Sequence, residues 1–121
     1  MGSELLAAVR AAVGALEAKK AYHLVALDVS ARTSIADAFV ICSVGSERQA
    51  QAVADEVDRA LLALGQRALS VEGYANSGWI LMDYGDFIVH VFLEERREYF
   101  ALERLWGDAP EITAQVRAGG A

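Results

Sequence analysis

The segment of residues 79–92, which reads Trp-Ile-Leu-Met-Asp-Tyr-Gly-Asp-Phe-Ile-Val-His-Val-Phe, constrains the fold more than any other part of the chain. Two apolar runs, 79–84 and 87–92, meet at a Tyr-Gly-Asp turn, which is the pattern of a β-hairpin. A two-residue loop at positions 84 and 85 and a four-residue loop at 83–86 both give the same register. That register pairs Asp83 with Asp86, Leu81 with Ile88, and Trp79 with His90.

The two faces of this hairpin differ in character, because side chains alternate along a strand and match across a ladder. One face is wholly apolar and consists of Ile80, Met82, Phe87, Val89 and Val91. The other face is mixed and carries Trp79, Leu81, Asp83, Asp86, Ile88 and His90. We expect helices to cover the apolar face. We expect the mixed face to be at least partly open, since a buried carboxylate without a partner is costly.

Two interpretations of the mixed face stand side by side. The like charges of Asp83 and Asp86 repel unless a cation or a backbone donor offsets them, and a basic partner would do so. Aspartate is also common in turns, where its side chain accepts backbone N–H bonds. Trp79 is either a binding hot spot, in which aromatic residues are enriched, or a side chain packed beneath a loop.

The rest of the chain predicts one α/β domain over residues 1–110 and a flexible tail over 111–121. Apolar periodicity predicts a helix at 3–20, and Ser46 with Gln49 forms a capping box for a second helix that ends at Gly65. Further strands are expected at 22–29, 37–43 and 67–71, and a last helix at 94–106. Because a strand, a helix and a strand follow one another, strands 37–43 and 67–71 are predicted to be parallel, with a right-handed crossover.

Composition excludes several classes of protein. The chain of 121 residues carries 11 Lys and Arg against 17 Asp and Glu, a net charge of −6, which argues against broad binding to nucleic acid. Its longest stretch without a charged residue, 73–82, is too short for a membrane span of about 20 apolar residues. A lone Cys42 and the absence of a signal-like N-terminus favour a reducing compartment, the cytoplasm.

An enzymatic interpretation has weak support. Gly45 and Ser46 at the start of a helix are similar to the phosphate-holding turn of nucleotidyltransferases. Those enzymes also need paired carboxylates for Mg²⁺, whereas the next strand offers only Glu72, so Ser46 is more simply a helix cap. Cys42 lies in an apolar strand that disfavours its thiolate, and His23 and His90 lack metal-ligand spacing. We therefore expect no metal and no cofactor.

The segments Asp-Ala-Phe-Val-Ile-Cys at 37–42, Gly-Ser-Glu-Arg-Gln-Ala at 45–50, Glu-Gly at 72–73, 78–92 and Tyr-Phe-Ala-Leu-Glu-Arg-Leu-Trp at 99–106 together resemble the ribosomal silencing factor family, also called Iojap-like. The resemblance covers about residues 3–110. One departure is Ala38, where relatives often have a larger residue.

The resemblance implies a translation repressor and not an enzyme. Family members bind the inter-subunit face of the large ribosomal subunit through the ribosomal protein numbered fourteen, and they hinder joining of the small subunit when nutrients are scarce. Organelle relatives act in large-subunit assembly, and free members can form homodimers. The fold is similar to the nucleotidyltransferase α/β sandwich without its catalytic acids, and a nucleotidyltransferase-like enzyme and an assembly factor are the alternatives. The partner-binding residues it implies are Glu72, Trp79, Leu81, Asp83, Tyr84, Asp86 and His90.

Overall fold

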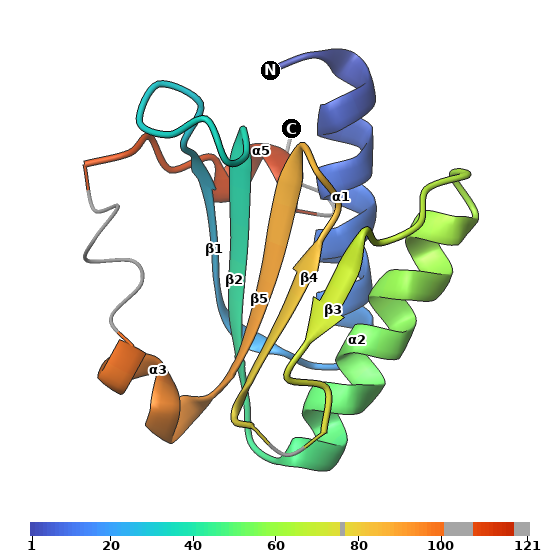
Figure 1. The fold of residues 1–121 in the computed structure, drawn as a ribbon, viewed down its shortest axis with the longest axis vertical. Helices are drawn as coiled ribbons and strands as arrows, with labels where there is room; N and C mark the ends of the chain where they lie inside the picture. The colour runs from blue at the N-terminus through green and yellow to red at the C-terminus, as the bar shows by residue number, and fades with distance from the viewer. Residues whose placement is uncertain (76, 101–107, 118–121) are drawn as a thin grey trace.

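The computed structural model describes residues 1–75, 77–100 and 108–117, with the backbone alone for 98–100. It is a mixed α/β fold, in which a five-stranded sheet lies against helices (Figure 1). The elements in chain order are α1 (Ser3–Ala18), β1 (Tyr22–Asp28), β2 (Ala38–Val44), α2 (Glu47–Leu62), β3 (Ser70–Glu72), β4 (Trp79–Asp83), β5 (Phe87–Leu93), α3 (Glu94–Phe100) and α5 (Thr113–Val116). No helix of the described segments is long and apolar enough to span a bilayer.

The strand order is β1-β2-β5-β4-β3, and among the four strand pairs of the described residues β2–β5 is parallel and the other three are antiparallel. Strands β2 and β3 run in the same direction, as the sequence predicts, but they are not neighbours, because β5 and β4 lie between them. Burial explains this order. Every residue of β2 is buried, as are all residues of β5 except Leu93, whereas all three residues of β3 are exposed. The most apolar strands therefore occupy the middle of the sheet.

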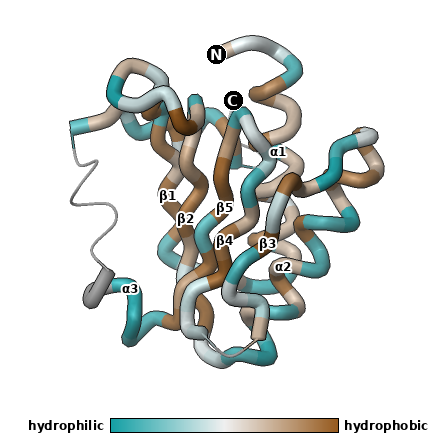
Figure 2. Tube along the Cα trace, viewed as in Figure 1, coloured by the Kyte–Doolittle hydropathy of each residue, from teal (hydrophilic) through white to brown (hydrophobic). Residues whose placement is uncertain are grey.

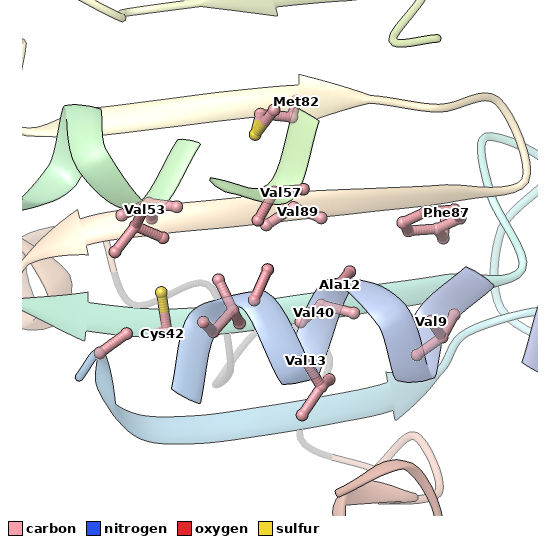
Figure 3. Close-up of a cluster of buried hydrophobic side chains, with 14 of the residues drawn as sticks. Val9, Ala12, Val13, Val40, Cys42, Val53, Val57, Met82, Phe87 and Val89 are labelled. Carbon is pink, nitrogen blue, oxygen red and sulfur yellow. The ribbon is translucent and has the colours of Figure 1, made fainter. Parts of the chain in front are cut away.

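Helices α1 and α2 cover one face of the sheet, which we call the helix face (Figure 1). Their apolar stripes pack onto the alternate residues of the central strands, as Figure 3 shows for Val9 and Val13 of α1, Val53 and Val57 of α2, and Val89 beneath them. The predicted apolar face of the hairpin lies in this core, and each of its members is no more than 1% exposed: Ile80, Met82, Phe87, Val89 and Val91.

The register of the hairpin differs from the prediction by two residues. Trp79 pairs with Phe92, and Leu81 pairs with His90. The turn itself consists of Gly85 and Asp86, because the Tyr84 N–H donates to the Phe87 carbonyl oxygen at 3.0 Å. Gly85 has a φ of +88°, a conformation that glycine adopts without strain. A shift of two residues leaves every side chain on its predicted face, since the period of a strand is two.

Residues 111–117 also differ from the prediction, which made 111–121 a flexible tail, and residues 118–121 of that tail lie outside the described residues. The Ile112 N–H donates to the Ala26 carbonyl oxygen at 2.8 Å, and the Thr113 hydroxyl accepts the Ala26 N–H at 3.0 Å. Ile112 and Val116 are buried, and α5 packs on α1 and β1. The sheet edge at β1 has backbone groups to satisfy, and this segment satisfies some of them.

Local signals mark the second helix accurately. The Ser46 hydroxyl accepts the Gln49 N–H at 3.0 Å, and Gln49 reaches back to accept the Gly45 N–H at 2.8 Å. Gly65 has a φ of +76°, as its position after the helix predicts. The last predicted helix begins at Glu94, and its portion at 101–106, with much of the aromatic motif there, lies outside the described residues.

Candidate functional site

The mixed face of the hairpin is less open than the sequence suggests. A second apolar cluster lies on this side of the sheet, and within the described residues it contains Leu27, Val29, Ala36, Phe39, Ile41, Ile88, Phe92 and Ala109. Ile88 and His90, which the prediction placed on an open surface, are 6% and 3% exposed. On the β4–β3 side of this face Trp79 and Leu81 are half-buried against the cluster, and Val25 of β1 is half-buried at the other edge.

Trp79 is held in one orientation by its neighbours. Its ring stacks on Phe92 with a centroid distance of 5.1 Å and an interplanar angle of 26°. Its Nε1–H donates to Nδ1 of His90 at 3.2 Å. The indole is therefore fixed against the sheet, a preorganised arrangement that lowers the entropy lost on binding.

His90 is 3% exposed, whereas the sequence placed it on a partly open face of the hairpin. It lies at the level of the sheet beneath Trp79, with Phe39 edge-on at 5.1 Å. Its Nδ1 accepts the indole hydrogen, so its own proton lies on Nε2, a buried atom that has no hydrogen-bond partner among the described residues. Burial lowers the pKa of His90 to about 4. His90 is thus a neutral acceptor that positions Trp79.

A pocket of about 270 Å³ brings together three of the predicted site residues. Glu72, Trp79 and Leu81 line it, with Gly73 and Ser77 between them. We call this the tryptophan pocket. Glu72 pairs with Leu81 across the β3–β4 ladder, so the carboxylate lies on the same face as the two apolar side chains. An apolar pocket with one carboxylate at its rim suits an aliphatic or aromatic side chain that has a cation beside it.

Gly73 and Ser77 were not predicted as site residues. The Ser77 hydroxyl lies 2.8 Å from the Gly73 carbonyl oxygen and accepts the Trp79 N–H at 3.1 Å, which closes the loop tightly. Gly73 has a φ of +77°, and a Cβ there would lie 2.1 Å from the Trp79 carbonyl oxygen. The Glu-Gly pair in the sequence was a signal of this close approach, but its structural reason appears only in three dimensions.

The turn residues divide between the two faces. Asp83 Oδ1 accepts the Gly85 N–H at 2.8 Å, so this aspartate has the turn role that was left open. Asp86 is exposed, and its carbonyl oxygen accepts the Asp37 N–H at 2.8 Å. Tyr84 is on the helix face, 8% exposed and stacked on Phe87 at 4.9 Å. It is therefore part of the core, whereas the sequence placed it on the partner-binding surface.

The crevice where a nucleotidyltransferase would hold phosphate is acidic here. It lies at the carboxyl ends of the parallel strands β2 and β5, has a volume of about 420 Å³, and is lined by Glu47, Glu94 and Glu95 beside Ser46. Three carboxylates repel a triphosphate, and the Ser46 hydroxyl is engaged as a helix cap. Glu72 lies on the edge strand β3, which β4 separates from β5, and it does not line this crevice.

The part of the chain that the structure describes gives little support for a metal site or for nucleophilic catalysis. No group of three or more His, Cys, Asp and Glu residues there could hold a metal ion. Burial raises the pKa of the Cys42 thiol to about 12, which suppresses the nucleophilic thiolate. His23 pairs with Glu94 at 2.7 Å on the surface.

Comparison with known proteins identifies similar chains. The family model described as "Ribosomal silencing factor during starvation" matches residues 3–119. A ribosomal silencing factor of Halalkalibacterium halodurans is 45% identical over 101 residues, 84% of this chain and 86% of that protein. A crystal structure of a protein from Chromobacterium violaceum has a TM-score of 0.81 at 34% identity and covers 88% of each chain. A mouse protein named "Mitochondrial assembly of ribosomal large subunit protein 1" is 29% identical over 97 residues, 78% of this chain and 42% of that protein.

Proposed function

Because the chain belongs to the ribosomal silencing factor family, we propose that it represses translation by binding the large ribosomal subunit. In this proposal it occupies the inter-subunit face, blocks joining of the small subunit, and acts when nutrients are limiting. The mechanism is steric, because a protein that occupies a docking surface needs no covalent chemistry. The relationship to bacterial silencing factors supports the cytoplasm as its location.

The observation that carries the proposal is the tryptophan pocket. Its half-buried Trp79 and Leu81 are held in place before any partner arrives, and preorganised aromatic residues are typical of binding hot spots. The occupant in this proposal is the ribosomal protein numbered fourteen of the large subunit. A negatively charged chain is steered toward a basic protein by long-range attraction.

The contact surface we propose is smaller than the sequence suggested. It consists of Glu72, Trp79 and Leu81, with Asp83 and the exposed Asp86 at the adjoining turn. His90 acts through Trp79 and touches nothing outside the protein. A homodimer of the free protein is also part of the proposal.

The first experiment is co-sedimentation with isolated large subunits. Trp79→Ala should lower the affinity by about 2 kcal/mol, close to thirtyfold, because it removes one wall of the pocket. The matched control is Ile35→Ala, since Ile35 is 67% exposed in the loop between β1 and β2. If Trp79→Ala stays folded and sediments like the wild type, the pocket is not the contact.

A second experiment separates this proposal from an enzyme. Saturating ATP with Mg²⁺ at about one hundred times its dissociation constant would raise the stability of a nucleotide-binding protein by about 2.7 kcal/mol. We expect no shift in Tm, because the crevice beside Ser46 carries three carboxylates. A clear upward shift would favour the nucleotidyltransferase alternative.

The mouse relative supports a second candidate, a role in assembly of the large subunit. The two roles differ in the substrate they bind. A silencing factor added to mature subunits should reduce the yield of joined ribosomes in a sucrose gradient. An assembly factor should leave joining unchanged, and its deletion should instead cause precursors of the large subunit to accumulate.

A further inference from the structure

Strand β3 forms one edge of the sheet, and in the described chain it pairs only with β4. All three of its residues are exposed, and the apolar side chains along this edge are unusually open: Leu69 at 74%, Val71 at 43% and Tyr74 at 40%. An edge strand leaves a row of backbone N–H and C=O groups without partners, which makes it a template for another strand.

A second pocket lies on the other side of β3, between this strand and α2. It has a volume of about 300 Å³ and is lined by Ala54, Asp55, Asp58, Val71, Tyr74 and Met82. We call it the helix-side groove. Val71 pairs with Met82, whose side chain points to the helix face, while Glu72 pairs with Leu81, which lines the tryptophan pocket. The two pockets therefore lie on opposite faces of one edge strand.

The segment after β3 is fixed against α2. Gln51 Nε2–H donates to the Tyr74 carbonyl oxygen at 2.9 Å, and the Tyr74 hydroxyl donates to Asp55 at 2.9 Å. Gly73, between these contacts and β3, lies against the Trp79 carbonyl. The edge and both pockets are thus shaped before binding, so a strand that docks there loses little entropy in the protein.

We propose that an extended, basic segment of the ribosomal partner adds to β3 as a sixth strand, with alternate side chains in the tryptophan pocket and the helix-side groove. Strand addition supplies affinity through main-chain hydrogen bonds, and pockets for alternate side chains supply specificity. This proposal rests on the proposed function, and it specifies how the partner is held.

Charge identifies the occupant as basic. Asp55 and Asp58 line the groove on one face of β3, and Glu72 lines the pocket on the other. A lysine or arginine on the added strand can reach a carboxylate on either face. A second copy of this chain would instead bring the same carboxylates toward each other, which is repulsive, so β3-to-β3 pairing between two copies is disfavoured.

The test is hydrogen exchange of the β3 amides in the full chain, with and without isolated large subunits. We expect slower exchange across residues 69–74 in the complex, since added-strand hydrogen bonds protect amides. If the wild-type chain binds subunits and Trp79→Ala weakens this binding, but hydrogen exchange at β3 is unchanged, strand addition is wrong. The proposed function then stands. If the wild-type chain does not bind subunits, both fail.

A matched pair of variants tests the groove. Val71→Lys puts a cation where a basic segment would lie, so binding should weaken at least about tenfold. Leu62→Lys is the control, because Leu62 is 39% exposed on α2, similar to Val71, and lines neither pocket. Val71→Thr keeps a β-branched residue, and it should retain the fold and most of the binding.

Two results would overturn the assignment. Equal binding by the Val71→Lys and Leu62→Lys variants would show that the groove is empty in the complex. Protection of the β3 amides that grows with the concentration of this protein alone, without subunits, would show that a second copy occupies the edge. Circular dichroism of each variant separates loss of binding from loss of fold.

Discussion

The apolar residues on the two faces of the sheet have different roles. On the helix face, α1 and α2 bury small and branched side chains against the central strands, and the buried atoms are almost all carbon (Figure 3). On the second face, the cluster is smaller and richer in large rings, and the buried imidazole of His90 and the half-buried indole of Trp79 pack beside it. Figure 2 shows the same hydrophobic colour along the central strands, so hydropathy alone does not separate the faces.

The difference shows where function can be added at little cost in stability. A closed core gains from every buried methylene, and a polar group in it needs a partner. Within the part of the chain that the structure describes, His90 has a hydrogen-bond partner at Nδ1 and none at Nε2. The second face thus gives up some stability at His90 and gains a fixed orientation for Trp79.

The largest effect we predict is on the helix face. Phe87→Ala removes a side chain that is 1% exposed and stacked beside Tyr84, and should reduce the free energy of unfolding by about 3–5 kcal/mol. Urea denaturation measures it. The folded fraction should bind large subunits with unchanged affinity, because Phe87 is remote from the pocket. A loss of affinity in the folded fraction would show that the helix face also contributes to binding, which would contradict the contrast between the two faces.

The next effect is the pH dependence from His90. Its pKa of about 4 in the folded state lies below the ordinary histidine value of 6.5, so the unfolded chain binds this proton first. Stability should therefore fall as pH drops from about 6.5 to about 4, by roughly 3 kcal/mol, and this contribution should be constant below that. His90→Phe should remove this part of the acid dependence. Chemical denaturation of both proteins across this range gives the difference.

A smaller effect on stability, with a larger effect on binding, is predicted for Leu81→Ala. Leu81 is half-buried at the pocket, so its truncation should reduce unfolding free energy by about 1 kcal/mol. Affinity for large subunits should fall by about 2 kcal/mol, as for a hot spot. Leu81→Ala should therefore lose more affinity than stability, whereas Phe87→Ala should lose stability and keep its affinity. If Leu81→Ala, like Phe87→Ala, loses stability and keeps its affinity, both faces serve the fold alone.

The smallest effect separates the two roles of Asp83. Asp83→Ala loses the bond to the Gly85 N–H and should cost about 1 kcal/mol of stability. Asp83→Asn keeps the acceptor and removes the charge, so its stability should be near that of the wild type. Weaker binding by Asp83→Asn would show that the charge contacts the partner. Unchanged binding by this variant would leave Asp83 with the turn role alone.

Much of the architecture could be predicted because local rules act at single positions. Ser46 and Gln49 mark a helix start through their own hydrogen bonds, and alternation along the hairpin assigns every side chain to a face. The pairing of β2 with β5 could not be predicted in this way, since parallel neighbours are set by burial across the whole sheet. The turn at Gly85 and Asp86 was missed because two loop positions satisfy the same alternation.

The candidate site was predicted less well than the fold. Glu72, Trp79 and Leu81 do converge on one pocket, although Glu72 comes from a separate strand. Tyr84 and His90 were placed on the partner surface because their neighbours in sequence belong there. Tyr84 follows the helix face, and His90 is covered by rings from β2 and β4. Sequence order does not show such covering.

Gly73 sets a limit on how this protein can diverge. The exposed residues around the pocket can be exchanged one at a time as a partner changes, and the edge strand tolerates many side chains. At position 73, however, any side chain would collide with the Trp79 carbonyl and would also have to adopt a φ of +77°. A lineage that loses this glycine loses the shape of the pocket and of the β3 edge in one step, and compensating changes would have to move both together.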